Sequence, residues 1–346
     1  MKVFSDCNQP ELRGCALTIG NFDGVHRGHL ALLRRLREAA AEEGVPTAVL
    51  TFDPHPGAVL SDRGAPPPLV WPERRAELLA QSGIDALIVL PSTPALFQTS
   101  AEDFFHDLLR RQLAIRAIVE GPDFRFGHRR AGNVRLLTEW CDQYGIRWEI
   151  VPPVECDGQP ISSTRIREAV QAGRIEQAGD MLSRPFATVG TVVHGAGRGA
   201  ALGYPTANLQ DLQTVIPGPG IYAGLAKIDG QAYAAAISIG GNPTFDEEQI
   251  KFEVFLCDFS GNLYERELEI LFLQRIRDVL RFDGVAALLD RMAIDVATAR
   301  ERAAEYLKDW RVEQADRCSR IIPAQPSEPS ATREGTGRPV APKSLS

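Results

Sequence analysis

The segment Thr18-Ile19-Gly20-Asn21-Phe22-Asp23-Gly24-Val25-His26-Arg27-Gly28-His29 decides the fold, because it joins two stretches of different periodicity. Before it, the apolar run from Cys15 to Ile19 predicts a buried strand. After it, leucines recur with the spacing of one helix face, at Leu30, Leu32, Leu33 and Leu36. The segment is therefore expected to form a tight turn between a strand and a helix.

The composition of this turn predicts a site for a phosphate group. Gly20, Gly24 and Gly28 let the backbone come close to a ligand, and a helix start offers unpaired N–H groups and the positive end of its dipole. His26 and His29 lie three residues apart at that helix start, so both side chains are expected to face one ligand. There they can donate hydrogen bonds to oxygens that gain charge during phosphoryl or nucleotidyl transfer.

Two other interpretations of the histidines stay open. They can form half of a zinc site, for which Asp23 is the nearest third ligand. They can also be ordinary turn histidines that bind nothing. Three glycines and two histidines in one short turn favour the phosphate site over both alternatives.

The composition of the whole chain excludes several classes of partner. The chain has 346 residues, 44% hydrophobic and 24% charged, which is enough for two globular domains. Its formal charge of −7 does not favour nucleic acid or anionic membranes, although it allows a local pocket for a small phosphate compound. The six cysteines form no C-x-x-C pair, so reduced thiols are expected. With no signal peptide pattern and no apolar run of membrane-spanning length, we expect a cytoplasmic protein. We also expect its partners to be small molecules, and the protein to be a monomer or a transient homo-oligomer.

Residues 15 to 151 alternate short apolar runs with helical patterns. The expected strands are residues 16–19, 47–52, 86–90, 117–119 and 147–151, and the expected helices are 30–41, 73–81, 101–112 and 134–144. This order predicts an α/β fold, a parallel sheet with helices on both faces, whose ligands bind beyond the carboxyl ends of the strands. The histidine turn and two further conspicuous segments, residues 51–56 and 121–127, fall at those ends.

A hydroxyl-rich helix entry follows the last of these strands. Ser162, Ser163 or Thr164 can simply cap that helix. Ser163 and Thr164, together with Arg165 or Arg167, can instead bind a polyphosphate through hydroxyls, helix N–H groups and a guanidinium.

The pattern changes near residue 184, where we expect a boundary between a domain of residues 1–184 and one of residues 185–311. Short β-type runs separated by turn residues predict a small antiparallel barrel or sandwich; they are residues 187–193, 221–228, 231–239, 251–257 and 267–272. Helical patterns return at residues 285–292 and 295–310. Residues 312–346 are rich in proline, serine and polar residues and predict a disordered tail.

The β-rich region has a candidate site of its own between Val193 and Leu209. Its glycines favour a flexible hairpin loop as much as a ligand site. Thr206 and Asn208 alternate along an extended chain, so their oxygens share one face and can help to hold Mg²⁺ beside a nucleotide. Glu253 is either an exposed strand carboxylate or, if it faces the glycine-rich loop, a general base that takes a proton from an attacking hydroxyl.

In this order along the chain, the motifs resemble those of the prokaryotic bifunctional riboflavin kinase/FAD synthetases, over roughly residues 13 to 309. The matching segments are residues 20–29, 52–56, 123–127, 161–167, 205–208 and 240–245, with Glu253. The histidine motif alone belongs to the wider nucleotidylyltransferase superfamily. Pro205-Thr206-Ala207-Asn208 in a β-rich domain is specific to the flavin enzymes.

The resemblance implies two ATP-dependent reactions on one chain. A C-terminal riboflavin kinase barrel would phosphorylate riboflavin to FMN, with Thr206 and Asn208 at the Mg²⁺-bound ATP and Glu253 as the base on the ribityl 5′-hydroxyl. An N-terminal Rossmann-like nucleotidylyltransferase domain would transfer AMP from ATP to FMN, giving FAD and pyrophosphate, with His26 and His29 stabilising the charge on the α-phosphate. Nucleotide binding would involve Gly20, Asn21, Phe22, Asp23, Gly24, Gly28, Asp123, Ser163, Thr164 and Arg167 in the first domain, and Gly197, Arg198, Gly203 and Pro205 in the second.

Three positions in the kinase half depart from the family pattern. Ala200 stands where the family usually has an arginine before Leu-Gly, and Arg198 lies two residues away. Glu265 replaces the glycine that usually follows a tyrosine. Val279 replaces a usually acidic residue near the last helix, while Arg277 remains. These departures keep one alternative enzyme open, an FAD synthetase whose barrel only binds flavin. A flavin-binding or flavin-delivering protein and an electron-transfer flavoprotein are further alternatives from other classes.

Overall fold

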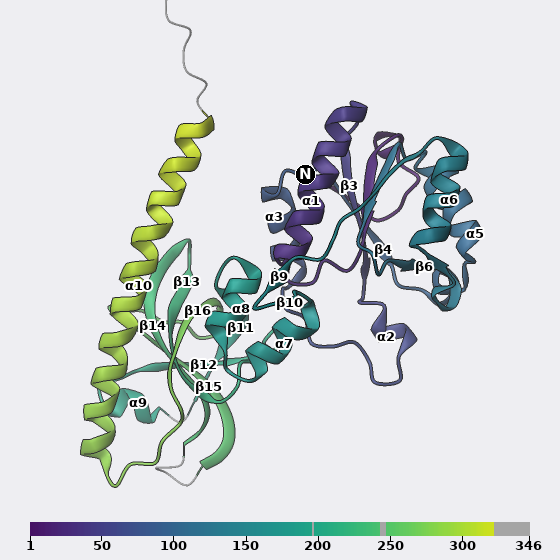
Figure 1. Ribbon diagram of the computed structural model, residues 1–346. Helices are drawn as coiled ribbons and strands as arrows, with labels where there is room; N and C mark the ends of the chain where they lie inside the picture. Colours follow the sequence, from purple (N-terminus) through teal and green to yellow (C-terminus); the bar gives the residue numbers. More distant parts are fainter. Residues whose placement is uncertain (196, 243–246, 322–346) are drawn as a thin grey trace, which may run out of the picture. The chain divides into compact units, whose positions relative to one another are not determined.

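The computed structural model describes residues 1–195, 197–242 and 247–321. The N-terminal part is a six-stranded parallel sheet in the order β1-β4-β3-β2-β5-β8 (Figure 1). Its strands are β1 (Lys2–Phe4), β2 (Ala16–Ile19), β3 (Thr47–Asp53), β4 (Ala86–Pro91), β5 (Ala117–Glu120) and β8 (Arg147–Ile150). The predicted α/β fold is confirmed, and β1 is an edge strand that the sequence pattern did not indicate.

Helices cover both faces of this sheet and bury its central strands β2, β3 and β5 on both sides. On one face, Leu36 of α1 (Arg27–Glu43) and Leu79 of α3 (Pro72–Gln81) share a core with Val49. On the other face, Leu109 shares a second core with Leu17. The helices of this second face are α5 (Ala101–Asp103), η2 (Phe104–Gln112) and α6 (Val134–Tyr144). The predicted helix over residues 101–112 is therefore present, but most of it is a π-helix.

Short elements lie in the connections of this part of the chain. They are η1 (Pro10–Leu12), α2 (Gly57–Leu60), α4 (Pro94–Gln98), the two-stranded β6 (Arg125–Phe126) and β7 (Gly132–Asn133), η3 (His128–Arg130), and the hairpin of β9 (Glu155–Cys156) and β10 (Gln159–Pro160). The segment 121–127 predicted at the carboxyl edge of the sheet thus leads into a small hairpin.

The second half is a closed antiparallel barrel in the order β11-β12-β15-β14-β13-β16. Its strands are β11 (Phe186–Val193), β12 (Thr206–Gln210), β13 (Gly220–Ile228), β14 (Gln231–Asn242), β15 (Glu247–Leu256) and β16 (Glu267–Arg277). The structure thus decides between the two predicted architectures in favour of the barrel. Five of its strands were predicted; β12 was expected only as extended chain, and the short helix α9 (Arg198–Ala201) precedes it.

Two helices before the barrel pack into its core. α7 (Ser163–Gln171) and α8 (Ile175–Leu182) bury Ile166, Val170 and Met181 in one cluster with Phe186 and Phe272 of the barrel. This hairpin lies on the N-terminal side of the predicted boundary at residue 184, yet its apolar side chains belong to the core of the barrel. α7 is therefore an element of both halves, because its first residues contact the histidine turn, as described below.

One long helix, α10 (Val285–Ile321), replaces the two helices predicted over residues 285–310. It continues through Ile321, into the segment predicted as a tail from residue 312. Residues 322–346 of that predicted tail lie outside the described residues, as do residues 243–245 of the predicted 240–245 motif. Of the two compact units of the chain, one ends at Glu305 and the other begins at Tyr306.

Candidate active sites

The histidine turn follows β2 directly and is held in an unusual backbone conformation. Phe22, Gly24 and Val25 have φ of +48°, +85° and +39°, in the left-handed region. For a β-branched residue such as Val25 this conformation is rare and strained. The turn ends at His26, which precedes the first residue of α1. The predicted order of strand, tight turn and helix start is confirmed.

His26 is the N-cap residue of α1. Its Nδ1 accepts a hydrogen bond from the backbone N–H of His29, at 3.3 Å. Because a neutral imidazole has one N–H, the proton of His26 then lies on Nε2, which makes that atom a donor. One nitrogen of the ring thus caps the helix, while the other remains a donor.

The two histidine rings are stacked and neutral. Their centroids lie 3.7 Å apart with planes inclined by 14°, and Phe22 packs against His29 with centroids 4.9 Å apart. Burial, helped by the charge of Arg184, lowers the pKa of His26 to about 4. Burial, helped by His26 and Arg184, lowers the pKa of His29 well below its usual range. At neutral pH the pair offers hydrogen-bond donors to a phosphate without carrying charge itself.

The other predicted residues of the turn bind to neighbouring elements. The side-chain amide of Asn21 lies 2.9 Å from Nε2 of His55. Asp23 accepts a hydrogen bond from the backbone N–H of Leu69, at 2.8 Å, and forms an ion pair with Arg167. The Asp23 carbonyl accepts a hydrogen bond from the Ser163 hydroxyl, at 2.9 Å. The start of α7 is thus brought against the histidine turn, as the two motifs together predicted.

The residues of the hydroxyl-rich helix entry make different contacts. Ser162 is the cap of α7, because its hydroxyl accepts from the backbone N–H of Arg165, at 3.3 Å. The guanidinium of Arg165 donates to the carbonyl of Gln159, at 2.8 Å, in the β9–β10 hairpin. The guanidinium of Arg167 contacts Asp23 and the carbonyl of Pro67, at 2.8 Å. Of the two arginines, Arg167 is therefore the one held at the histidine turn.

Thr164 and Asp123 are less fixed by contacts than the other predicted residues. Both side chains are exposed. Asp123 follows β5, which pairs with β2, so it lies at the same edge of the sheet as the histidine turn.

The zinc interpretation of the histidines finds no support: the described residues contain no group of three or more His, Cys, Asp or Glu side chains that could hold a metal.

Sequence reasoning missed three residues of this region. Arg75 of α3 is largely buried and donates to the carbonyl of Asn21, at 3.3 Å, and burial lowers its pKa. Glu120 at the end of β5 is buried and accepts from the backbone N–H of Ile19, at 2.7 Å; burial raises its pKa well above the usual range. Arg184 binds carbonyls of the turn itself. Glu120 ends an apolar run, which was a usable signal, whereas both arginines look like ordinary surface residues in the sequence.

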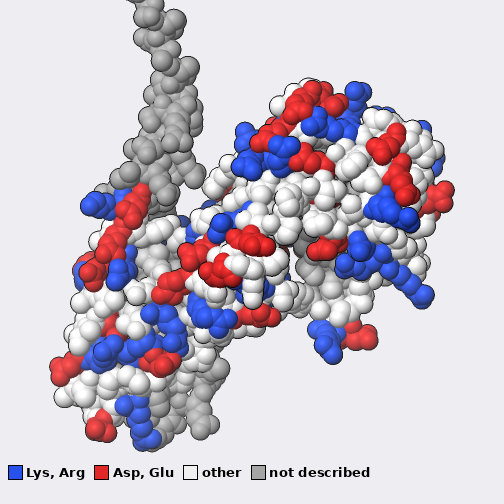
Figure 2. All heavy atoms as spheres, viewed as in Figure 1, with Lys and Arg blue, Asp and Glu red and all other residues white. Residues whose placement is uncertain are grey.

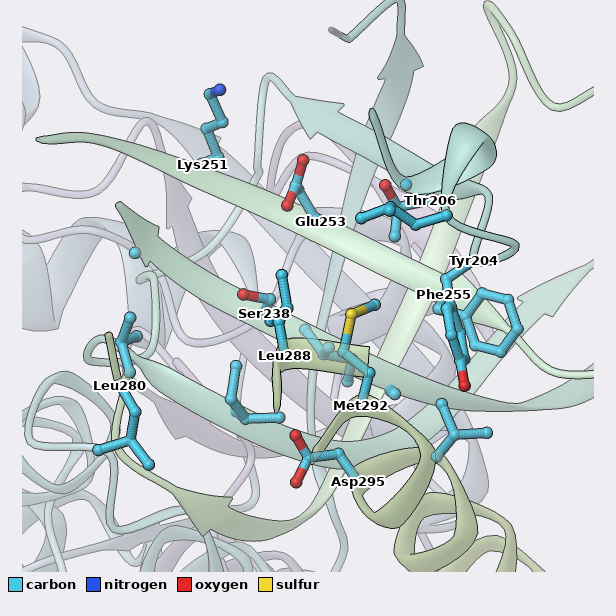
Figure 3. Close-up of a pocket in the computed structure, with 18 of the residues that line it drawn as sticks. Tyr204, Thr206, Ser238, Lys251, Glu253, Phe255, Leu280, Leu288, Met292 and Asp295 are labelled. Atoms are coloured by element: carbon cyan, nitrogen blue, oxygen red, sulfur yellow. The ribbon is translucent and has the colours of Figure 1, made fainter. Parts of the chain in front are cut away.

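The barrel carries a second candidate site on its outer face. Along β12, Ala207 and Leu209 point into the core, so Thr206 and Asn208 point outward. Glu253 of β15 is paired in register with Asn208, and Phe255 with Thr206. Figure 3 shows Thr206 and Glu253 on these neighbouring strands, lining one cavity. Gly197 and Gly199 of the glycine-rich loop line the same cavity as Glu253, as its predicted function as a base requires.

The opposite wall of this cavity is apolar and comes from the start of α10. Leu288 and Met292 face the strands in Figure 3, with Asp295 below them. Asp295 is buried and forms hydrogen bonds with Arg277, at 2.6 to 3.2 Å, and with Arg291, at 3.1 Å. The cavity thus joins polar oxygens on the barrel to an apolar wall, as a binding site for an amphipathic ring system requires.

A further cavity, of about 660 Å³, adjoins the first one. Thr206 lines both. The other lining residues include Gly203 and Pro205 of the predicted nucleotide set and residues 258–264 of the loop after β15. This volume lies in the range of small-molecule sites.

The side chain of Asn208 packs closely against Gly195, since a Cβ at Gly195 would lie 2.1 Å from the amide nitrogen of Asn208.

The three departures from the family pattern differ in their surroundings. Ala200 is exposed on α9, and Val279 lines the cavity of Glu253. Glu265 has φ of +63°, in the left-handed region that favours glycine. The glycine usual at this position therefore has a backbone reason, and glutamate adopts the same turn at an energetic cost.

On the face drawn in Figure 2, Lys and Arg side chains are interspersed with Asp and Glu side chains. In the part of the chain that the structure describes, no helix is both long and apolar enough to cross a bilayer.

Comparisons with known proteins match both halves of the chain. The family model of FAD synthetase matches residues 8–165, and that of riboflavin kinase matches residues 182–303. A bifunctional riboflavin kinase/FMN adenylyltransferase of Pseudomonas fluorescens is 39% identical over 297 residues, covering 86% of this chain and 95% of that protein. The chain belongs to this family. The enzyme of the same name from Listeria monocytogenes is 36% identical over 284 residues, covering 81% of this chain and 89% of that one.

The fold of this riboflavin kinase/FMN adenylyltransferase also recurs in a solved structure. A crystal structure described as a macrolide-efflux protein from Streptococcus pneumoniae has a TM-score of 0.76 and 33% sequence identity, and covers 87% of this chain and 99% of that chain. Within the family, the interpretation as an FAD synthetase alone is not favoured, because a riboflavin kinase model matches the barrel as well.

Proposed function

We propose that this bifunctional enzyme phosphorylates riboflavin at the Glu253 cavity and adenylylates FMN at the histidine turn. The register of the barrel carries the first assignment, because it sets Glu253 directly beside Asn208. Residues that face each other on antiparallel strands have Cβ atoms about 4.5–5.5 Å apart. The proposed base and the proposed Mg²⁺ ligand therefore lie on adjacent strands, close enough to act on one bound substrate.

In the kinase reaction, Glu253 takes the proton of the ribityl 5′-hydroxyl. The hydroxyl oxygen then attacks the γ-phosphorus of ATP, the bond from that phosphorus to the β–γ bridging oxygen breaks, and ADP leaves. The apolar wall formed by Leu288 and Met292 suits the flavin ring. The base and ribose of ATP fit the adjoining cavity, because Thr206 lines both cavities and therefore marks the position of the phosphates.

Magnesium fits the donor set of the barrel. Thr206 and Asn208 offer a hydroxyl and an amide oxygen, the hard neutral ligands that Mg²⁺ accepts when a nucleotide supplies most of the charge. When bound, the ion would neutralise charge that develops on the transferred phosphoryl group. Gly195 supports this site because it leaves room for the amide of Asn208. Gly197, Arg198 and Gly203 complete the proposed nucleotide set.

In the adenylyltransferase reaction, a phosphate oxygen of FMN attacks the α-phosphorus of ATP and pyrophosphate leaves. Nε2 of His26 donates a hydrogen bond to the α-phosphate oxygen that gains charge. His29, whose ring is stacked on that of His26, stabilises the same charge. Ser163, Thr164 and the start of α7 bind the triphosphate, and Asn21 and Asp123 position the substrates. Because Arg167 is paired with Asp23, it contributes to this site together with that carboxylate.

The proposed substrates, riboflavin, FMN and ATP, are small molecules. We further propose that both reactions take place in the cytoplasm, and we expect neither nucleic acid nor a membrane to take part. A monomer or a transient homo-oligomer suffices, because each proposed site is built from residues of one chain.

A time course tests the proposal. Purified protein is given riboflavin, ATP and Mg²⁺, and riboflavin, FMN and FAD are separated by chromatography. We expect FMN first and FAD later. If riboflavin gave no FMN while added FMN gave FAD, the kinase assignment would be refuted; if added FMN gave no FAD, the assignment of the histidine turn would be.

A further inference from the structure

Arg184 connects the barrel to the histidine turn. It stands two residues before Phe186, the first residue of β11. Its guanidinium donates to the carbonyls of Val25, at 3.0 Å, and of Gly24. A third contact, also at 3.0 Å, goes to the carbonyl of Leu182 at the end of α8. An arginine in the connection between the two halves thus binds the main chain immediately before His26.

The backbone that Arg184 binds is the strained part of the turn. Val25 itself has φ of +39°, a conformation that a β-branched residue keeps only when its surroundings impose it. The N–H of Val25 bonds back to the carbonyl of Phe22, at 3.2 Å, inside the turn. The carbonyl of Val25 is held from outside, by Arg184. The position of the next residue, His26, therefore depends on that contact.

A second connection runs from the barrel to the same turn. The backbone N–H of Val215, in the loop before β13, donates to the carbonyl of Pro68, at 2.7 Å. The next residue, Leu69, donates its N–H to the carboxylate of Asp23, at 2.8 Å. The barrel thus contacts the histidine turn along two independent routes, one through the Arg184 guanidinium and one through this segment.

We propose that Arg184 is a positioning residue for FMN adenylylation, through which the start of the barrel holds His26 and His29 in their reactive arrangement. This inference rests on the adenylyl transfer proposed for the histidine turn. It adds that the N-terminal site is completed by a residue outside the FAD synthetase match, which ends at residue 165. The barrel then has a structural function in the adenylyltransferase besides its own kinase reaction.

The charge of Arg184 acts in the same direction as its geometry. Its positive charge helps burial to lower the pKa of both His26 and His29. Two other charged groups lie nearby. Arg74 carries the same charge as Arg184 and helps to lower its pKa, and Asp23 is paired with Arg167. Removing the charge of Arg184 therefore raises the histidine pKa values, and protonated histidines appear at a higher pH.

The test compares Arg184→Met and Arg184→Lys in the full chain, with Arg13→Met as the matched control. Arg13 is exposed and also binds two main-chain carbonyls, those of Arg111 at 3.1 Å and Gln112 at 3.0 Å, but it precedes β2 at the opposite end of that strand. Each variant is assayed for FAD from FMN and Mg-ATP across pH 5 to 9, and for FMN from riboflavin. The kinase rate reports whether the chain has folded.

For Arg184→Met we expect kcat for FAD to fall about 10- to 100-fold, since a misplacement of reacting groups by about 1 Å costs on that order. KM for FMN should change by less than about 3-fold, the kinase rate should stay near that of the wild type, and the acid limb of the kcat profile should move to higher pH. Arg184→Lys should keep the acid limb in place, because it keeps the charge, and should recover only part of kcat. Arg13→Met should match the wild type in both reactions.

Two results would overturn the proposal. The first is a folded Arg184→Met enzyme whose kcat for FAD and acid limb equal those of the wild type. The second applies if Arg184→Met also loses kinase activity, and it is full FAD formation by Arg184→Lys. A wild-type enzyme that made no FAD at all would count against the proposed adenylyl transfer itself, which separates the two failures.

Discussion

His26→Asn should abolish most FAD formation without weakening the fold. The substitution removes the Nε2 donor that, in the proposed reaction, binds the oxygen that gains charge. It keeps an oxygen at the N-cap position, where Nδ1 of His26 accepts the backbone N–H of His29 at 3.3 Å, and asparagine is among the best N-cap residues. The variant therefore separates the two functions that the structure combines in this ring.

The size of the effect follows from those two functions. One donor aimed at a developing oxyanion contributes about 2.7–4 kcal/mol, so kcat should fall about 10²- to 10³-fold. The free energy of unfolding should fall less than in His26→Ala, because the N-cap oxygen is kept. His26→Ala should show the same loss of kcat and lose about 1 kcal/mol of stability in addition, because the cap is gone.

The assay measures FAD from FMN and Mg-ATP by chromatography, with FMN formation from riboflavin on the same sample as the internal reference. Urea unfolding gives the stability. Ser100→Ala is the matched control, since its hydroxyl caps α5 through the N–H of Asp103, at 2.9 Å, away from the histidine turn. It should cost stability and leave FAD formation intact. If His26→Asn kept more than about a third of kcat, the assignment of a donor to His26 would be wrong.

Three further predictions concern carboxyl groups. Glu253→Gln should lower FMN formation about 10²- to 10⁴-fold and leave FAD formation from added FMN unchanged, because only the base is lost; equal losses in both assays would contradict this. Glu265→Gly should raise the free energy of unfolding by about 1 kcal/mol in urea, because it relieves a φ of +63°. A loss of stability would show that the side chain matters more than the backbone. Glu120 has a raised pKa in the folded state, so the wild type should lose stability as pH rises above the unfolded pKa of about 4.3. Glu120→Gln keeps an oxygen for the N–H of Ile19, and its stability relative to the wild type should be higher at pH 8 than at pH 5; a difference that does not vary with pH would refute this.

The sequence predicts those features that depend on neighbours along the chain. β2 was expected at residues 16–19 and is found there, because four buried residues lead directly into a glycine turn. α6 likewise occupies the predicted residues 134–144. The β12 strand was not recognised, since its polar outward residues Thr206 and Asn208 follow a glycine-rich loop and hide the alternation with Ala207 and Leu209.

Long-range pairs set the limit of sequence reasoning in the histidine site. Arg167 was predicted to bind polyphosphate, and the structure shows it paired with Asp23, a residue 144 positions away. Arg184 contacts Val25 across 159 positions. No local pattern distinguishes such an arginine from one on the surface, because periodicity reports which face of an element is buried and not which distant carbonyl it meets.

The two sites are held in place by different means, and they should respond differently to change. Thr206, Asn208 and Glu253 stand on paired strands, so the register of the barrel itself fixes their spacing. The histidines stand after a strained turn, whose shape depends on contacts such as that of Arg184 from outside the sheet. The kinase site should therefore tolerate changes in its loops, such as Ala200 and Glu265, whereas the adenylyltransferase site should lose activity through substitutions far from its ligands.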